Sequence, residues 1–301
     1  MAAPVHHPKP PPRLVRAQEA AAGGWLAELP ALVDDVCARW GLTAERVVEP
    51  GGRSSMTVLV TAADGGRAAL KISPPDGSAA IEEAALRRWN GLGAVRVLRS
   101  APESGALLLE RLRGETSLRS LPDAKAMLEA VSAVRRLWVD PGEHHPFPTV
   151  GERTAAQAAL LRAAADDETG PLVDEALRHH GELTAAPGER LLLHGDFRQG
   201  IVLASDAERS PWLAVGPEPL VGERAYDLAR LVRDRLHDLV ASPGAAAITR
   251  RRVTRLAESV DLDPDRLRAW SHFRAVESAL RNLDQGRAAD AEMLLEFATW
   301  L

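Results

Sequence analysis

The stretch Leu191-Leu-Leu-His-Gly-Asp-Phe-Arg-Gln-Gly-Ile-Val-Leu203, followed shortly by Trp212-Leu-Ala-Val-Gly-Pro217, decides the fold of this chain. Short apolar runs, which are typical of buried strands, surround a polar loop that carries one carboxylate, Asp196. We therefore expect Leu191–Leu193, Ile201–Leu203 and Trp212–Val215 to form short strands around this loop.

The spacing around Asp196 resembles the catalytic core of the aminoglycoside phosphotransferases, most closely the streptomycin 6-kinase branch. In that branch the pattern is H-G-D-x-x-x-x-N, followed by a strand that ends in I-D-P. The resemblance runs from about Trp25 to Leu301 and includes the blocks Ala69-Leu-Lys-Ile-Ser-Pro-Pro75, Trp89-Asn-Gly-Leu-Gly-Ala-Val-Arg96, Leu107-Leu-Leu-Glu-Arg111 and Ala225-Tyr-Asp227. It implies an α+β, bilobal, protein-kinase-like fold with a small β-rich N-lobe and a larger helical C-lobe.

Two positions depart from the family pattern. Ile201 stands at the Asn position and Gly216 at the second Asp position, and in kinases of this architecture these two residues hold magnesium. Magnesium prefers hard oxygen ligands, whereas Ile201 offers only hydrocarbon and Gly216 offers no side chain. The sequence therefore predicts no metal ligands at these positions and no cofactor, with ATP and magnesium expected only if the coordination has been rearranged.

The resemblance assigns roles to residues in both lobes. Asp196 would accept a hydrogen bond from a substrate hydroxyl, and the adjacent Arg198 would lower its pKa or bind an anionic group. Lys71 lies at the end of an alternating strand, where the family's lysine pairs with phosphates and with a helix glutamate. Glu82 is the expected partner by spacing and Glu83 the alternate; an exposed strand lysine is the competing interpretation.

Further candidates come from a glycine-containing loop and from the C-terminal half. Gly52 and Ser54 lie where the family has its phosphate-covering loop, although a plain turn is the better default for so short a pattern. The predicted substrate-binding residues are Gln199, Glu277, Arg281 and Asp284. Acidic residues of this region hold cationic sugars in the family, and Arg281 would repel such a substrate; the competing interpretation is the exposed face of amphipathic helices. Asp227 is expected to brace the catalytic loop or to cap the helix near Ala225.

Composition excludes several classes of protein. The chain has 301 residues, enough for two modest lobes, and a net charge of −5, which favours neither nucleic acid nor an anionic membrane. Cys37 is the single cysteine, so neither a disulfide framework nor a cysteine zinc cluster is expected. These features, with no apolar run of membrane-spanning length and no signal-peptide pattern, predict a cytoplasmic protein. The sequence does not indicate the oligomeric state.

The order of the predicted elements divides the chain into three regions: a proline-rich disordered or extended tail at 1–13, an N-lobe at 14–114 and a C-lobe at 115–301. The N-lobe pattern predicts helices at 25–41 and Ser78–Trp89 and strands at Arg46–Val48, Met56–Thr61, Ala68–Ile72 and Leu107–Leu112. The C-lobe pattern predicts helices at Ala124–Trp138, 154–165, 172–180, Ala225–Val240, 246–259 and 263–301, the last broken near Gly286 and capped by Asp263.

Three functions remain open at this point. The paired loss at Ile201 and Gly216 favours a pseudokinase that binds a small molecule or a peptide in the cleft between the lobes. The second is an active small-molecule phosphotransferase whose metal is held differently, through Gln199 or Glu218. The third is a natural-product enzyme that uses Asp196 for acid–base chemistry without ATP.

Overall fold

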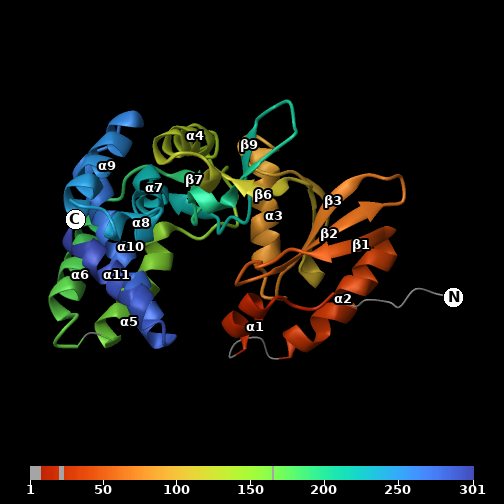
Figure 1. The fold of residues 1–301 in the computed structure, drawn as a ribbon, viewed down its shortest axis with the longest axis horizontal. Helices are drawn as coiled ribbons and strands as arrows, with labels where there is room; N and C mark the ends of the chain where they lie inside the picture. Colours follow the sequence, from red (N-terminus) through yellow and green to blue (C-terminus); the bar gives the residue numbers. More distant parts are fainter. Residues whose placement is uncertain (1–7, 20–23, 165) are drawn as a thin grey trace. The chain divides into compact units, whose positions relative to one another are not determined.

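The computed structural model describes residues 8–19, 24–164 and 166–301. The chain divides into two compact units. The first comprises Met1–Arg113 together with the short segment Ser205–Arg209, and the second comprises Gly114–Ala204 and Ser210–Leu301. The order of elements is α+β, as predicted: strands dominate the first unit and helices the second (Figure 1). The first unit therefore takes in a segment from the second half of the sequence, which the pattern of elements did not predict.

The first unit is an antiparallel sheet with helices packed against it (Figure 1). The sheet has five strands in the order β1-β2-β3-β5-β4. The element bounds are α1 Pro12–Gln18, α2 Trp25–Trp40, β1 Leu42–Val47, β2 Met56–Ala62, β3 Arg67–Ile72, α3 Ser78–Trp89, β4 Val97–Ala101 and β5 Ala106–Glu110. Alternation along β2 and β3 buries one face of the sheet, and the apolar stripe of α2 covers it with Leu29, Val33 and Val36.

Local signals set the ends of several of these elements. Helix α2 ends at Gly41, which adopts φ +66°, a conformation that glycine reaches without steric cost. A turn at residues 64–66 joins β2 to β3 in a hairpin, and Asp64 accepts a hydrogen bond from the N–H of Gly66 at 2.8 Å. Strand β4 was not predicted, because its burial does not alternate regularly and its register shifts between Val97 and Arg99.

The N-terminal tail was predicted to extend to Arg13. Its first seven residues lie outside the described residues, whereas α1 begins at Pro12. Proline suits the first turn of a helix because its missing N–H would have no partner there. The last two residues of the predicted tail, Pro12 and Arg13, therefore belong to α1, whose next residue, Leu14, is fully buried in the core of the first unit.

The second unit is helical around three short strand pairs (Figure 1). The bounds are β6 Arg113–Ser117, α4 Asp123–Arg135, α5 Val150–Ala164, α6 Gly170–Ala185, β7 Leu191–Leu193, β8 Val202–Ala204, β9 Trp212–Ala214, β10 Leu220–Gly222, α7 Arg224–Val232, α8 Leu236–Val240, α9 Ala245–Ser259, α10 Pro264–Asp284 and α11 Ala288–Thr299. Strand β7 pairs with β10, and β8 lies between β6 and β9.

Helix α10 forms the centre of this unit. It packs against α6, α7, α9 and α11, and its Trp270 and Phe273 rings meet edge to face at 5.9 Å. Asp263 caps it as predicted, accepting from the N–H of Asp265 at 2.9 Å. The predicted break near Gly286 separates α10 from α11. No helix among the described residues is both long and apolar enough to cross a membrane.

The prediction of a single continuous helix at Ala225–Val240 is wrong. The structure contains two helices, α7 and α8, and Arg235 between them adopts φ +57°. That conformation is uncommon for a residue with a side chain. Here it is stabilised because the guanidinium of Arg235 donates to Gln199 Oε1 at 2.8 Å and to the carbonyl of Leu121 at 2.7 Å.

Candidate functional site

The His194-Gly195-Asp196 loop follows β7 and is held from below by Asp227 of α7. The two oxygens of Asp227 accept hydrogen bonds from the backbone N–H of His194 at 2.9 Å and of Gly195 at 2.7 Å. The indole N–H of Trp138 donates to the same carboxylate at 3.2 Å. Burial raises the pKa of Asp227, and these hydrogen bonds oppose that rise. The predicted bracing role of Asp227 is confirmed.

Glycine is required at position 195. Gly195 adopts φ +80°, and a Cβ there would lie 1.9 Å from the carbonyl oxygen of Glu218. The close approach allows the N–H of Glu218 to donate to the carbonyl of His194 at 2.9 Å. The loop that presents Asp196 is therefore fixed from two sides, by α7 and by the chain after β9.

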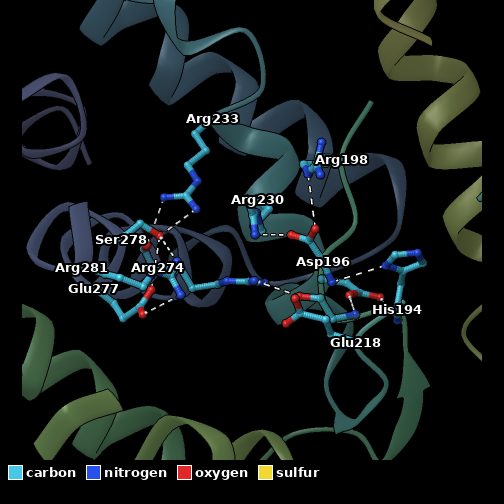
Figure 2. Close-up of polar contacts among 12 residues, drawn as sticks. His194, Asp196, Arg198, Glu218, Arg230, Arg233, Arg274, Glu277, Ser278 and Arg281 are labelled. Carbon is cyan, nitrogen blue, oxygen red and sulfur yellow. Dashed lines mark hydrogen bonds and ion pairs between the residues drawn. The ribbon is translucent and has the colours of Figure 1, made fainter. Parts of the chain in front are cut away.

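The carboxylate of Asp196 is bound by two arginines (Figure 2). Arg230 of α7 forms an ion pair with Oδ1, and Nε of Arg198 lies 3.4 Å from Oδ2. Sequence analysis singled out Arg198 but missed Arg230. The signal was its position three residues after Asp227, because residues three apart on a helix share a face.

These charges decide the protonation of Asp196. Burial by itself would raise the pKa of Asp196, but Arg230, Arg198, His194 and Arg274 together hold it below its ordinary value. A carboxylate with a lowered pKa and both oxygens in ion pairs is a weak proton acceptor. The loop thus keeps the family's acidic residue in an arrangement that opposes its use as a base.

Two further arginines, Arg274 and Arg233, lie to one side of Asp196 (Figure 2). Arg274 of α10 donates to the carbonyls of Gly195 at 2.9 Å and Tyr226 at 2.8 Å, with its guanidinium 4.2 Å from the centre of the Tyr226 ring. Arg233 donates in turn to the carbonyl of Arg274 at 3.1 Å and to Ser278 Oγ at 2.9 Å. Arginine guanidinium groups therefore surround the loop from α7 and α10.

The two family metal positions lie next to each other. The N–H of Val215 donates to the carbonyl of Ile201 at 3.0 Å, which places Gly216 one residue from that link. Ile201 is buried and Gly216 adopts φ +63°. Neither side chain supplies a carboxylate or an amide oxygen, so these side chains do not fit magnesium. Among the described residues, no three His, Cys, Asp or Glu side chains are grouped to share a metal ion.

The substitute ligands considered for an active enzyme have other partners. Gln199 has no exposed surface: its N–H donates to Asp234 at 2.5 Å and its Oε1 accepts from Arg235. This placement argues against the predicted contact of Gln199 with a substrate as well as against metal binding. The carboxylate of Glu218 is largely exposed and lies 3.3 Å from Arg153.

The predicted substrate residues of the C-terminal half are only partly brought together. Glu277 and Arg281, one turn apart on α10, form an ion pair at 3.2 Å, and Glu277 also accepts from Ser278 Oγ at 3.3 Å (Figure 2). Because Glu277 offsets its charge, Arg281 is a weaker barrier to a cation than the sequence suggested. Asp284 at the end of α10 is exposed.

In the first unit, Lys71 and Glu82 form the predicted ion pair, with Nζ 2.5 Å from Oε2. Lys71 comes from β3 and Glu82 from α3, and their side chains are 12% and 5% exposed. Glu83, the alternate, instead accepts from Arg87 at 2.7 Å. The spacing argument therefore selected the correct glutamate.

The glycine-containing loop is exposed at Gly52 and Ser54. It is held by the N-terminal segment, because Gln18 of α1 donates to the carbonyl of Arg53 at 2.9 Å. A Cβ at Gly51, which has φ +70°, would lie 3.0 Å from Pro11 Cγ. The predicted contact of Gly52 and Ser54 with phosphate stays a prediction.

Replacing Lys71 with alanine is expected to lower the free energy of unfolding by about 3 kcal/mol, because it leaves a buried glutamate without its counter-charge. Thermal melting of Lys71→Ala against the wild type measures this effect. The double change Lys71→Met with Glu82→Leu removes both charges and should recover most of the loss. An unchanged melting temperature in Lys71→Ala would show that the lysine is a solvated strand residue.

A histidine cluster between α6 and α10 predicts a loss of stability in acid. Burial lowers the pKa of His272 to about 4, although Glu175, 3.7 Å from its Nε2, opposes that shift. His179, whose ring lies 5.3 Å from that of His272, also has a lowered pKa because of burial. As the pH falls, His272 binds a proton in the unfolded chain before it does so in the folded one. Its contribution to the free energy of unfolding is therefore fully present above pH 6.5 and is lost as the pH drops towards 4.

The loss attributable to His272 reaches up to about 3 kcal/mol at the acid end of this range. Urea denaturation between pH 7.5 and pH 4.5 checks it. His272→Phe should show a shallower dependence of unfolding free energy on pH than the wild type, whereas the exposed His144→Phe should follow the wild type. Parallel pH curves for His272→Phe and the wild type would contradict the assignment.

Comparison with known proteins places these features in a family. A family model described as aminoglycoside/hydroxyurea antibiotic resistance kinase matches residues 39–286. Streptomycin 6-kinase of Streptomyces glaucescens is 35% identical over 269 residues, covering 88% of this chain and 86% of that protein. Hydroxyurea phosphotransferase of Kitasatospora aureofaciens is 36% identical, covering 87% of this chain and 75% of that protein.

Comparison with solved structures shows the same fold in an aminoglycoside phosphotransferase. The crystal structure of a thermostable mutant of aminoglycoside phosphotransferase APH(4)-Ia, a ternary complex with AMP-PNP and hygromycin B, superposes with a TM-score of 0.61. Its sequence identity is 17%, and the match covers 88% of this chain and 96% of that chain. The chain belongs to the aminoglycoside/hydroxyurea antibiotic resistance kinase family.

Proposed function

We propose that this chain is a small-molecule-binding member of the family that no longer carries out magnesium-dependent phosphoryl transfer. The observation that carries this proposal is the state of Asp196, whose two carboxylate oxygens are paired with Arg230 and Arg198. A carboxylate held in this way has little capacity to take a proton from a substrate hydroxyl.

The donor set at the metal positions supports the same proposal. Phosphoryl transfer depends on cations that neutralise the charge spread over the phosphate oxygens. When bound, magnesium supplies that neutralisation, and it requires oxygen ligands that the side chains of Ile201 and Gly216 lack. The arginines around Asp196 bind the protein's own carboxylate and carbonyl groups.

A second candidate is an active phosphotransferase, and the comparisons favour it over loss of activity. The relatives named above are phosphotransferases that match most of the chain, and the Lys71–Glu82 ion pair is present. In this case the metal would be held differently, and of the two groups considered, Gln199 is buried against Arg235 whereas the carboxylate of Glu218 is exposed. Acid–base chemistry without ATP has less support, because it needs the same proton acceptance by Asp196.

Titration with ATP in the presence and absence of magnesium, together with a turnover assay using labelled ATP, separates the candidates. Streptomycin and hydroxyurea are the substrates to assay first, with the S. glaucescens streptomycin 6-kinase as positive control. We expect no magnesium-dependent turnover above background. Rates of about 1–1000 per second, abolished by Asp196→Asn, would establish the active phosphotransferase instead.

A further inference from the structure

We propose that the pocket beside Asp196 binds the acid group of a small organic ligand, a carboxylate or phosphate attached to a compact apolar body. This inference rests on the proposed ligand binding, and it does not depend on whether phosphoryl transfer has been lost. The pocket lies within the second unit and has a volume of about 180 Å³. Its lining residues are Arg198, Arg230, Arg233, Asp234, Leu236, His237, Asn282, Asp290, Met293 and Leu294.

One wall of the pocket carries three guanidinium groups with too few counter-ions. Arg198 and Arg230 share a single carboxylate, Asp196. Arg233 has neutral partners, the carbonyl of Arg274 and the hydroxyl of Ser278. No carboxylate among the described residues lies within ion-pair distance of Arg233. Buried charges in proteins are ordinarily paired with an opposite charge. This wall of the pocket therefore lacks an anion, and the acid group of a ligand can supply it.

The electrostatic state of Arg233 agrees with a missing anion. Burial and the neighbouring Arg230 and Arg274 lower the pKa of Arg233 well below its ordinary range, and Glu277 opposes this only in part. Bringing an acid group to Arg233 would relieve the repulsion among these like charges. A cationic ligand would add to it, which distinguishes this pocket from one built for an aminoglycoside.

Neither carboxylate of the lining is paired with Arg233. Asp234 accepts the N–H of Gln199 at 2.5 Å, and burial raises its pKa although the nearby Arg119, Arg198 and Arg230 oppose that rise. Asp290 lies 3.8 Å from Arg287, a residue outside the lining. Both acids therefore have partners of their own.

The remaining wall defines the body of the ligand. Leu236 of α8 with Met293 and Leu294 of α11 offers an apolar surface, and Asn282 offers a side-chain amide. The volume equals that of about six water molecules, which accommodates an acid group and a short aliphatic chain or one ring. A small aromatic or aliphatic acid fits the charge on one side and the hydrocarbon on the other.

Isothermal titration at fixed ionic strength, without ATP or magnesium, tests the assignment. The probes are benzoate, phenyl phosphate, inorganic phosphate and streptomycin. We expect saturable binding of benzoate or phenyl phosphate with a dissociation constant below about 1 mM, and inorganic phosphate to bind about tenfold more weakly. Equal affinity for inorganic and phenyl phosphate, or tighter binding of streptomycin, would overturn the assignment of an organic acid.

Arg233→Gln is the decisive variant because Arg233 has no ion pair to break within the described part of the chain. Its affinity for the organic acid should fall about tenfold or more, while the exposed Arg251→Gln, which removes the same charge from α9, should bind like the wild type. If Arg233→Gln does not fold, Arg198→Gln replaces it with the same expectation. Unchanged acid binding in the folded variant would overturn the proposal. Phosphoryl transfer in the separate turnover assay would overturn only the proposed function.

Discussion

Asp227→Ala is expected to lower the free energy of unfolding by about 3 to 5 kcal/mol. The fully buried carboxylate of Asp227 accepts hydrogen bonds from the backbone N–H groups of His194 and Gly195 and from the indole of Trp138. Alanine would leave all three donors without a partner in the interior and would open a small cavity beside α7. Each unsatisfied buried donor costs about 1 to 3 kcal/mol, which is why the expected loss is large.

Guanidinium denaturation of three variants measures this effect. Asp227→Asn retains one carbonyl oxygen but turns an amide donor towards the loop's own N–H donors, so it should lose less stability than alanine. Asp284→Ala, which removes an exposed carboxylate from α10, should stay within about 0.5 kcal/mol of the wild type. A loss below about 1 kcal/mol in Asp227→Ala would mean that the His194–Asp196 loop is held by other contacts.

The second large effect concerns the metal positions. Ile201→Asn combined with Gly216→Asp is expected to raise affinity for ATP in the presence of magnesium by about tenfold or more, because it supplies the missing amide and carboxylate oxygens. No atom lies within 4 Å of a Cβ built at Gly216, so the new side chain has room. Aspartate also tolerates the left-handed backbone there better than most residues.

Titration calorimetry with and without magnesium checks this gain. The matched control is Ile201→Leu with Gly216→Asn, which changes both positions without restoring the carboxylate or the amide at 201. We expect affinity rather than turnover to change, because Arg230 and Arg198 would still bind Asp196. Our interpretation of the site is wrong if the wild-type chain already binds ATP with magnesium as tightly as the double variant.

The sequence predicted those parts of the molecule that depend on local pattern. Alternation located β2 and β3, and glycine marked the end of α2 and the break after α10. Glu82 was identified because a fixed strand and a fixed helix leave few partners for Lys71. These features need only the period of the element and a few conformational preferences.

Features that depend on long-range contacts were not predictable. The spacing of three residues places Arg230 on the same helix face as Asp227, but its ion pair with Asp196 can be identified only once α7 is placed beside the loop. The break at Arg235 has neither glycine nor proline, and its left-handed backbone is maintained by bonds to Gln199 and Leu121, far away in the sequence. Gln199 was predicted to bind substrate, and it is buried by those same contacts.

The return of Ser205–Arg209 to the first unit has a consequence for synthesis of the chain on the ribosome. Arg209 donates to the carbonyl of Gly91 at 2.8 Å and forms an ion pair with Glu110, 99 residues earlier. At a translation rate of about 5–20 residues per second, Glu110 is synthesised roughly 5–20 s before Arg209. The N-terminal unit is therefore completed only when most of the second unit's β-strands have been translated, and a nascent chain released after Arg113 would lack the ion pairs of Glu110 with Arg209 and of Arg113 with Asp206.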